Sequence, residues 1–383
     1  MRGADDPNPV PRELAALRGD IDSIDHELVA LVARRAAVVA KIAGWKRRNA
    51  FPIRDPNREQ EVISGGRARA LALGVQPGVA ENLLRLLLAS SRDQQARLRT
   101  EIAPDVEPRT VAVIGGKGAM GRCMAGVFAD LGHRVIIADL DTEVTPQDAA
   151  SRADVVVLSV PIDATEETAR QLGPLVRDEA LLMDVASVKE GPLRAMLEST
   201  RASVVGTHPL FGPSVHSVQG QRVVLTPGRG DAWLAWLKRN LTARGLIVRE
   251  SSPREHDAAM GIVQVLTHFS TEVMGRALTL LGASVERTLE FTSPVYLMEL
   301  LMTARHFAQS PELYASIQMT NPRTPEVTRA FVQAAEELQG VVQRKDRAAF
   351  RAMFEQIRAG FGGFEDSALE RSSDLIDRLV ERL

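Results

Sequence analysis

A glycine-rich segment, VAVIGGKGAMG, contains the residues best suited to binding a nucleotide. Gly116, Gly118 and Gly121 have the spacing GxGxxG after an apolar run, Met120 lies among them, and Asp139 closes the next run 18 residues beyond Gly121. Glycines permit a tight turn and close approach of the backbone to a pyrophosphate at the N-terminus of the following helix. The acid accepts hydrogen bonds from ribose hydroxyls and repels a 2′-phosphate. The segment predicts binding of NAD rather than NADP; the alternative is a glycine turn that binds no nucleotide.

Two further polar residues follow short runs rich in β-branched residues. Ser187 lies in DVASVKEGPL and His208 in VVGTHPLFGPS. In a doubly wound sheet the ends of such strands face the ligand crevice. We therefore expect His208 to point toward a nicotinamide, with Ser187 across from it. His256 and His268 belong to a later helical segment, and a purely structural role for each of them stays open.

Arg35 occupies a position where the pattern calls for an apolar residue. Its seam is formed by residues at spacings of three and four, namely Leu14, Leu17, Ile21, Ile24, Leu28, Leu31, Val38, Ile42 and Trp45. A buried arginine is costly unless a counter-charge meets it. Lys46 follows 11 residues later, about 20° round the helix from Arg35, so both cations face one way. They favour binding of a small polyanion, together with the polar residues that follow: Asp55, Arg58, Glu59, Ser91 and Gln95.

The polyanion site must be positioned by an all-helical region, residues 10–100. Its first helix is predicted over 12–48, which at about 1.5 Å per residue makes it roughly 55 Å long. A domain of about 100 residues has a radius of gyration of about 13 Å. The helix therefore extends beyond its own domain, and we expect it to pack against a second chain. Prolines end it, and shorter helices are predicted over 57–73 and 79–98.

The dinucleotide site needs a different architecture, and the pattern changes after a proline-containing linker, residues 101–109. From 110 to 252 the chain has short β-branched runs, the earlier of which are interleaved with helical stretches. This alternation predicts a parallel, doubly wound sheet of the Rossmann type. The predicted strands are 111–114, 134–138, 155–160, 181–184, 203–205, 223–226 and 246–249. From 253 to 383 the pattern is helical apart from breaks at prolines, and one long helix is predicted to carry both His256 and His268.

Composition narrows the possible functions. The chain has 383 residues, 45% hydrophobic and 25% charged, as in ordinary globular proteins. It has no run near the roughly 20 apolar residues of a membrane span and no apolar signal at its start, so we expect a cytoplasmic enzyme without a membrane partner. A net charge of −2 argues against a nucleic-acid partner. One cysteine, Cys123, excludes an internal disulfide and a multi-cysteine zinc site, and no metal site is predicted.

The helical region resembles the AroQ-type chorismate mutases in all the polar residues named above. The resemblance implies an intertwined homodimer that rearranges chorismate to prephenate by holding one conformer and stabilising charge across the breaking C–O bond. It implies that Arg35 and Arg58 bracket the substrate carboxylates together with Arg18, which the partner chain supplies. It further implies that the ether oxygen is bound by Lys46 and Gln95, and the hydroxyl region by Asp55 and Glu59, with Ser91 as a further polar contact.

The rest of the chain resembles the prephenate dehydrogenases of the TyrA family over roughly residues 108–375, most specifically in GTHPLFGPS and ASVKEGPL. The resemblance implies oxidation of prephenate by NAD with loss of CO2, giving 4-hydroxyphenylpyruvate. It implies that His208 accepts a hydrogen bond from the C4 hydroxyl, which suits a histidine near neutral pKa. Ser187 then helps to hold that hydroxyl, Arg305 binds a carboxylate, and His256 and His268 are further substrate-binding candidates. Tyrosine is a possible feedback effector.

Together the resemblances identify a bifunctional enzyme of tyrosine biosynthesis. The expected order is an AroQ-like all-α mutase domain, a central Rossmann-type α/β domain that binds NAD, and an all-α dimerisation domain. One alternative is a prephenate or arogenate dehydrogenase whose first domain is a non-catalytic dimerisation or regulatory module. Another is a generic hydroxyacid or 6-phosphogluconate-type dehydrogenase, which leaves Arg35 and GTHPLFGPS unexplained.

Overall fold

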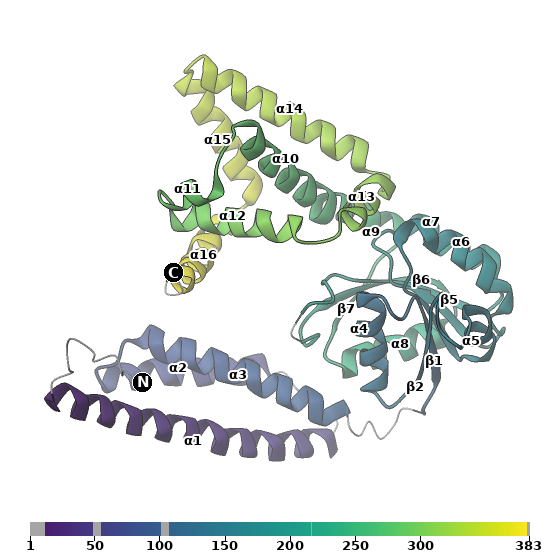
Figure 1. The fold of residues 1–383 in the computed structure, drawn as a ribbon, viewed down its shortest axis with the longest axis horizontal. Coiled ribbons are helices and arrows are strands. Elements are labelled where there is room, and N and C mark those ends of the chain that lie inside the picture. The colour runs from purple at the N-terminus through teal and green to yellow at the C-terminus, as the bar shows by residue number, and fades with distance from the viewer. Residues whose placement is uncertain (1–11, 49–54, 101–106, 216, 381–383) are drawn as a thin grey trace, which may run out of the picture.

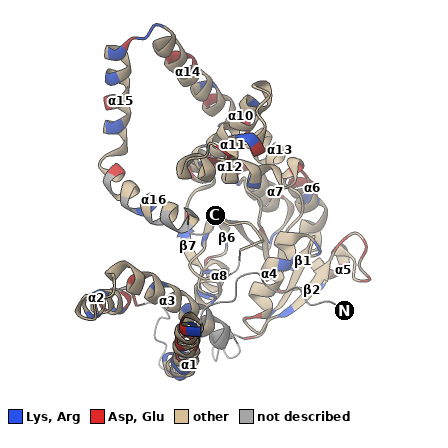
Figure 2. Ribbon diagram, turned by 60° about the vertical axis from the view of Figure 1, so that its left-hand side comes forward, with Lys and Arg blue, Asp and Glu red and all other residues tan. Residues whose placement is uncertain are grey.

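The computed structural model describes residues 12–48, 55–100, 107–215 and 217–380, which form three successive regions (Figure 1). A group of three long helices comes first, a seven-stranded sheet covered by helices follows, and a larger group of helices ends the described chain. Lysine and arginine are interspersed with acidic residues over the helical regions (Figure 2), in line with the small net charge. None of the described helices combines the length and the apolarity that a membrane span requires.

The first region consists of α1 (Arg12–Arg48), α2 (Pro56–Ala72) and α3 (Pro77–Thr100), and α3 packs against both other helices. The single long helix predicted from the apolar spacing is confirmed, and α2 and α3 each begin at a proline, which is favoured in the first turn. Val39 and Ala43, one and two turns beyond Arg35, are buried. In contrast, every residue of the apolar series from Leu14 to Trp45 is 42–58% exposed. One chain therefore leaves this face of α1 uncovered.

The second region is a sheet in the order β2-β1-β3-β4-β5-β6-β7. Its strands lie at or within a few residues of all seven predicted positions: β1 (Thr110–Ile114), β2 (Arg134–Ala138), β3 (Val155–Leu158), β4 (Leu181–Asp184), β5 (Ser203–Pro209), β6 (Arg222–Arg229) and β7 (Ile247–Glu250). Because β2 and β3 lie on opposite sides of β1, the chain reverses its direction of travel across the sheet at the end of β1. That point is where doubly wound folds bind ligands.

One part of the predicted sheet was wrong. The parallel arrangement holds from β2 to β5, but β6 is antiparallel to β5, and β7 is parallel to β6. No helix is present in the described residues between β5 and β6, and a parallel connection needs a crossover that is usually helical. The chain therefore returns beside β5 in the opposite direction.

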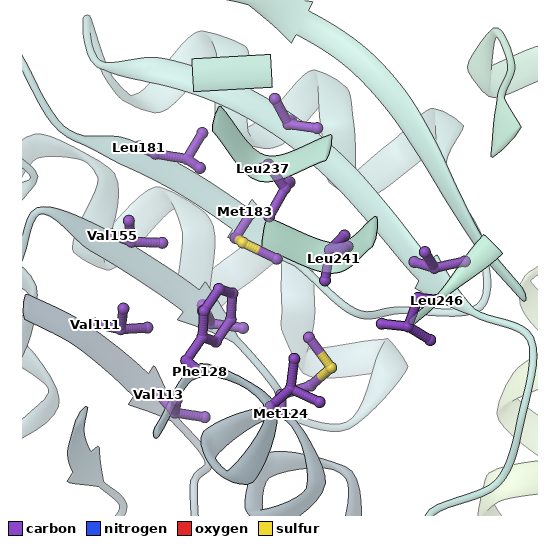
Figure 3. Close-up of a cluster of buried hydrophobic side chains, with 14 of the residues drawn as sticks. Val111, Val113, Met124, Phe128, Val155, Leu181, Met183, Leu237, Leu241 and Leu246 are labelled. Atoms are coloured by element: carbon purple, nitrogen blue, oxygen red, sulfur yellow. The ribbon is translucent and has the colours of Figure 1, made fainter. Parts of the chain in front are cut away.

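Helices cover both faces of the sheet. On one face, α4 (Ala119–Ala129) and α8 (Asp231–Ala243) enclose an apolar cluster in which Phe128 and Met183 are completely buried (Figure 3). On the other face a second cluster is enclosed by α5 (Pro146–Arg152), α6 (Ile162–Leu172), the short 3-10 turn Gly173–Leu175 and α7 (Glu190–Ser199). Burial on both faces explains why the central strands are continuous apolar runs.

The third region is helical, as predicted. It contains α9 (Pro253–Met260), α10 (Thr267–Leu280), α11 (Val285–Leu289), α12 (Pro294–Phe307), α13 (Pro311–Thr320), α14 (Thr324–Gln343), α15 (Arg347–Phe361) and α16 (Phe364–Val380). The single helix expected to carry His256 and His268 is instead interrupted by a π-helical segment, η2 (Gly261–Leu266). Such segments concentrate at functional sites because they redirect side chains within a helix.

Candidate active sites

The glycine-rich segment forms a cradle between β1 and α4 that side chains would fill. Gly115 has a φ of 76°, which favours glycine. A Cβ atom on Gly121 would lie 2.4 Å from the carbonyl oxygen of Gly115, and one on Gly116 would lie 2.8 Å from that of Val113. The close packing of helix on strand and the open loop are the two features that a pyrophosphate site needs.

The acid at the end of β2 lies against this cradle. One carboxylate oxygen of Asp139 accepts a hydrogen bond from the backbone N–H of Lys117 at 2.9 Å, and the other accepts from Leu140, also at 2.9 Å. The ammonium of Lys117 pairs with Asp141 at 2.8 Å. Met120 packs toward the apolar cluster below the loop. These residues fit a dinucleotide whose ribose carries no 2′-phosphate.

His208 is buried at the end of β5, where the sequence predicted it. Its Nδ1 lies 2.9 Å from Nε2 of His256, and Nδ1 of His256 lies 2.7 Å from a carboxylate oxygen of Asp257. The side-chain amide of Gln264, on the π-helical segment, lies 3.4 Å from the other ring nitrogen of His208. Burial, then the neighbouring His256 and Lys189, lowers the pKa of His208 well below its usual 6.5. The ring is therefore neutral at physiological pH.

A buried ion pair lies beside these histidines. The ammonium of Lys189 pairs with the carboxylate of Asp184 at the end of β4, and neither side chain is exposed to solvent. The same ammonium donates to the backbone oxygen of Thr207 at 2.7 Å, one residue before His208. Burial lowers the pKa of Lys189, and Asp184 acts in the opposite direction. The pair ties β4, β5 and the loop between β4 and α7 together.

Sequence reasoning missed Asp184, Lys189 and Asp257. For Asp184 and Lys189 a signal was present in the quoted string DVASVKEGPL, where they enclose a short loop whose only other polar residue is Ser187. Ser187 lies in the same loop and is half-buried, and its hydroxyl makes no hydrogen bond to the described residues. It therefore remains available to a ligand.

Beyond the π-helical segment, aromatic and polar side chains surround a cavity of about 480 Å³. Tyr314 stacks on His306 with ring centroids 3.7 Å apart, and His268 meets Tyr314 edge-on at 4.8 Å. Glu272 accepts from His306 at 3.0 Å. Burial, followed by His306, lowers the pKa of His268. Arg305 is exposed on α12, close enough to Tyr314 for its charge to act on the phenol.

In the first region, α1 and α3 bring predicted residues together. The guanidinium of Arg35 donates to the backbone oxygen of Leu87 at 3.0 Å and to the hydroxyl of Ser91. Gln95, one turn further along α3, is 9% exposed, and its side-chain oxygen has no hydrogen-bond partner among the described residues. Lys46 is half-buried on α1. The side-chain oxygen of Gln95, one turn from the serine that binds Arg35, could therefore accept a hydrogen bond from a polar ligand.

The other predicted mutase residues differ in their contacts. Glu59 pairs with Arg92 of α3 at 2.8 Å, a residue that sequence reasoning did not select. Arg58 is exposed and pairs with Glu61 at 2.9 Å. Asp55 caps α2 by accepting the backbone N–H of Arg58 at 3.0 Å. Arg18 is exposed on α1.

Comparison with known proteins identifies the domains. Three family models match: chorismate mutase type II over residues 17–96, the nucleotide-binding domain of prephenate dehydrogenase over 129–249, and the dimerization domain of prephenate dehydrogenase over 252–356. A T-protein of Enterobacter agglomerans is 35% identical over 95% of this chain and 97% of its own length. A T-protein of Haemophilus influenzae is 32% identical over the same shares.

A solved structure shows the same fold for the second and third regions. The prephenate dehydrogenase of A. aeolicus, crystallised with hydroxyphenyl propionate and NAD+, aligns with a TM-score of 0.55 and 19% identity over 67% of this chain and 98% of that chain. The fold and the two sites thus define a mutase joined to a dehydrogenase. The chain belongs to the T-protein family. It is a bifunctional chorismate mutase and prephenate dehydrogenase of tyrosine biosynthesis.

Proposed function

We propose that α1, α2 and α3 rearrange chorismate to prephenate at a site around Arg35, and that prephenate is then oxidised with NAD beside His208. The observation that carries the proposal is the bonding of Arg35. Among the described residues its guanidinium contacts only neutral oxygens, those of Leu87 and Ser91. A half-buried cation without a carboxylate partner is stabilised when an anionic substrate supplies the counter-charge.

The mutase needs no nucleophile or base, because the rearrangement is unimolecular. Arg35 and Arg58 bind the substrate carboxylates, and Ser91 fixes the orientation of Arg35. Lys46 and the amide of Gln95 donate hydrogen bonds to the ether oxygen, where negative charge develops as the C–O bond breaks. Asp55 and Glu59 contact the hydroxyl region. Donors fixed in advance lower the barrier because they are not reorganised during the reaction.

Arg18 acts on the mutase site of a second copy. It lies 17 residues before Arg35, which is about 25 Å along the axis of one helix, so the two arginines of one chain cannot meet one small substrate. The uncovered apolar face of α1 supports packing of two such helices side by side. The protein then works as a homodimer in which each mutase site takes Arg18 from the partner chain.

In the dehydrogenase site, His208 accepts a hydrogen bond from the C4 hydroxyl of prephenate. Ser187 donates to or accepts from the same hydroxyl and holds it against the ring. The glycine cradle and Asp139 hold NAD, which accepts the hydride when bound. Loss of CO2 leaves the aromatic ring of 4-hydroxyphenylpyruvate. Arg305 and His268 bind the substrate carboxylates at the far end of the crevice.

Two further parts of the proposal concern regulation and location. The cavity beside His306 and Tyr314 is lined by aromatic rings and polar groups that suit a ring-bearing amino acid, and tyrosine is the proposed effector. Work in the cytoplasm stays a prediction from the sequence.

A coupled assay tests the proposal. Purified protein is given NAD with chorismate as the only carbon substrate, and NADH formation is compared with a run started from prephenate. NADH from both substrates is the expected result. NADH from prephenate alone would make the first region a non-catalytic dimerisation or regulatory module. If neither substrate yields NADH, a run with arogenate decides whether the assigned substrate or the whole dehydrogenase assignment is wrong.

A further inference from the structure

We infer that Asp257 and His256 are positioning residues of the dehydrogenase, which fix the tautomer of His208 through two consecutive hydrogen bonds. This inference rests on the proposed role of His208 as the acceptor for the C4 hydroxyl. The ring of His208 can accept that bond only if the nitrogen facing the substrate carries a lone pair, and the other nitrogen must then carry the proton. The contacts of its neighbours determine which nitrogen that is.

The carboxylate of Asp257 starts the sequence of bonds. It is 1% exposed and accepts backbone N–H groups from Lys189 at 2.8 Å and from Glu190 at 2.9 Å. The side-chain amide of Asn321 donates to the backbone oxygen of the same residue at 3.0 Å. Two N–H donors stabilise an ionised carboxylate, which can only accept hydrogen bonds. Asp257 is therefore a fixed acceptor held from two separate parts of the chain.

The direction of each later bond follows from this acceptor. Nδ1 of His256, at 2.7 Å from Asp257, must carry a proton and donate it. In a neutral ring Nε2 of His256 is then an acceptor, so Nδ1 of His208, at 2.9 Å, must be the donor. Nε2 of His208 keeps its lone pair. The donor amide of Gln264 at 3.4 Å on that side agrees with this assignment.

This direction of the bonds requires a His256 ring that carries a single proton, on Nδ1. The groups facing the two rings are the ammonium of Lys189 and the carboxylates of Asp184 and Asp257. Lys189 and Asp184 pair with each other, and Asp257 accepts two backbone N–H groups besides its bond to the ring of His256. A doubly protonated His256 would reverse the chain of bonds and leave a proton on the substrate-facing nitrogen of His208. When His208 takes up positive charge during oxidation, the same bonds let His256 and Asp257 share it.

The direct test is the tautomer itself, measured in the full-length enzyme labelled with 15N-histidine. Long-range 1H–15N spectra distinguish protonated from unprotonated ring nitrogens, and comparison with a His208→Gln sample assigns the signals of His208. The expected result is a proton on Nδ1 and none on Nε2, with loss of this preference in His256→Phe. A proton on Nε2 of His208 in the unmodified enzyme would overturn the inference, whatever the activity.

Steady-state kinetics test whether this positioning of His208 matters for the reaction. His256→Phe keeps a ring but no hydrogen bond, and kcat for NADH formation from prephenate should fall on the order of 10²-fold or more, the scale of losing a correctly oriented base. His256→Gln offers an oxygen in place of Nε2 and should recover at least part of kcat, with KM changed far less in both variants. Equal kcat in the Phe and Gln variants would contradict a positioning role.

A matched substitution controls for loss of any buried histidine. His133 is 5% exposed and bonds to Asn240 at 2.9 Å, away from His208, so His133→Phe should leave the tautomer of His208 unchanged. Failure of the positioning inference can be distinguished from failure of the catalytic role proposed for His208. If His256→Phe abolishes the tautomer preference and kcat stays unchanged, the positioning is correct and the catalytic role of His208 is wrong.

Discussion

The two active sites differ in how completely one chain builds them. The dehydrogenase site is enclosed: His208, His256, Asp257, Asp184 and Lys189 are buried and bonded to one another across β4, β5 and α9. The mutase site is open, because Arg18 is exposed and the apolar face of α1 is uncovered. The fold of one chain organises the first site, whereas the second is proposed to take Arg18 from a second chain.

This difference follows from the local architecture. Parallel strands end at one edge of a sheet and bring residues distant in sequence into one crevice, where burial strengthens each hydrogen bond. A three-helix unit has no such edge. Its polar residues are spread along three long helices, and only their facing stripes meet within one chain. Chain association should therefore affect the mutase much more than the positions of the dehydrogenase groups.

The largest effect is expected in the enclosed site. His208→Asn removes the acceptor for the C4 hydroxyl, and kcat for NADH formation should fall about 10²–10⁴-fold, the usual contribution of a general base. KM for prephenate should change much less, because the carboxylate contacts remain. Steady-state rates with prephenate measure both. Disappearance of chorismate in the same sample should be unaffected; an unchanged dehydrogenase kcat would refute the role given to His208.

In the open site the key substitution is Arg35→Ala. It removes a charged partner of a substrate carboxylate. The transition state should lose about 3–4 kcal/mol of stabilisation, which lowers mutase kcat/KM roughly 10²–10³-fold. NADH formation from prephenate should be preserved. Arg34→Ala is the matched control, since the neighbouring arginine is exposed and turned to another side of α1. Parallel loss of both activities in Arg35→Ala would show that the sites are not independent.

Mixed dimers test the need for a second chain directly. Arg18→Ala and Arg35→Ala homodimers should both be inactive as mutases. In a dimer holding one of each, one site keeps its own Arg35 and receives an intact Arg18. Random mixing, by coexpression or by subunit exchange, should therefore restore about one quarter of the original activity, because half of the dimers are mixed and half of their sites are intact. Recovery near zero would place Arg18 in the same chain's site or outside any site.

Local sequence pattern predicted most of the architecture. The spacing of apolar residues and the positions of prolines located α1, α2 and α3 because both features act within a few residues of chain. The glycine spacing and Asp139 located the dinucleotide loop for the same reason. The pattern within the strand could not predict the direction of β6, since alternation of side chains is the same in parallel and antiparallel strands. The direction depends on the connection from β5, whose described residues contain no helix.

The hydrogen bonds around His208 also could not be predicted from local sequence pattern. Asp257 is 68 residues from Lys189, whose backbone N–H it accepts, and Gln264 is 56 residues from His208. No local rule links such residues, and the π-helical turn that presents Gln264 has no recognised signature in the sequence. His208 could be selected because it follows a strand, but the groups that hold it become visible only in three dimensions.

The burial of His208 in the enclosed site also determines how the dehydrogenase rate depends on pH. Burial lowers the pKa of His208 well below 6.5, so its neutral, active form should persist as the pH falls. At pH 6.0 an ordinary imidazole would be about three quarters protonated, yet the dehydrogenase should keep most of its rate. Profiles of kcat/KM for prephenate between pH 5 and pH 8 measure this. A half-maximal rate at or above pH 6.5 would contradict the low pKa.

The smallest effect concerns Asp55, which is proposed to contact substrate and also caps α2. Asp55→Ala removes both functions and should lower the stability of the helical region by about 1 kcal/mol, the usual value of an N-cap. Asp55→Ser keeps a capping oxygen but lacks the carboxylate, so it should unfold at nearly the original temperature. Thermal unfolding and mutase KM, measured on both variants, then separate the two roles. A raised KM for chorismate in the stable Ser variant would show that the carboxylate of Asp55 contacts the substrate. An unchanged KM would restrict Asp55 to capping α2, and the mutase site would then lack one substrate contact that the family resemblance implies.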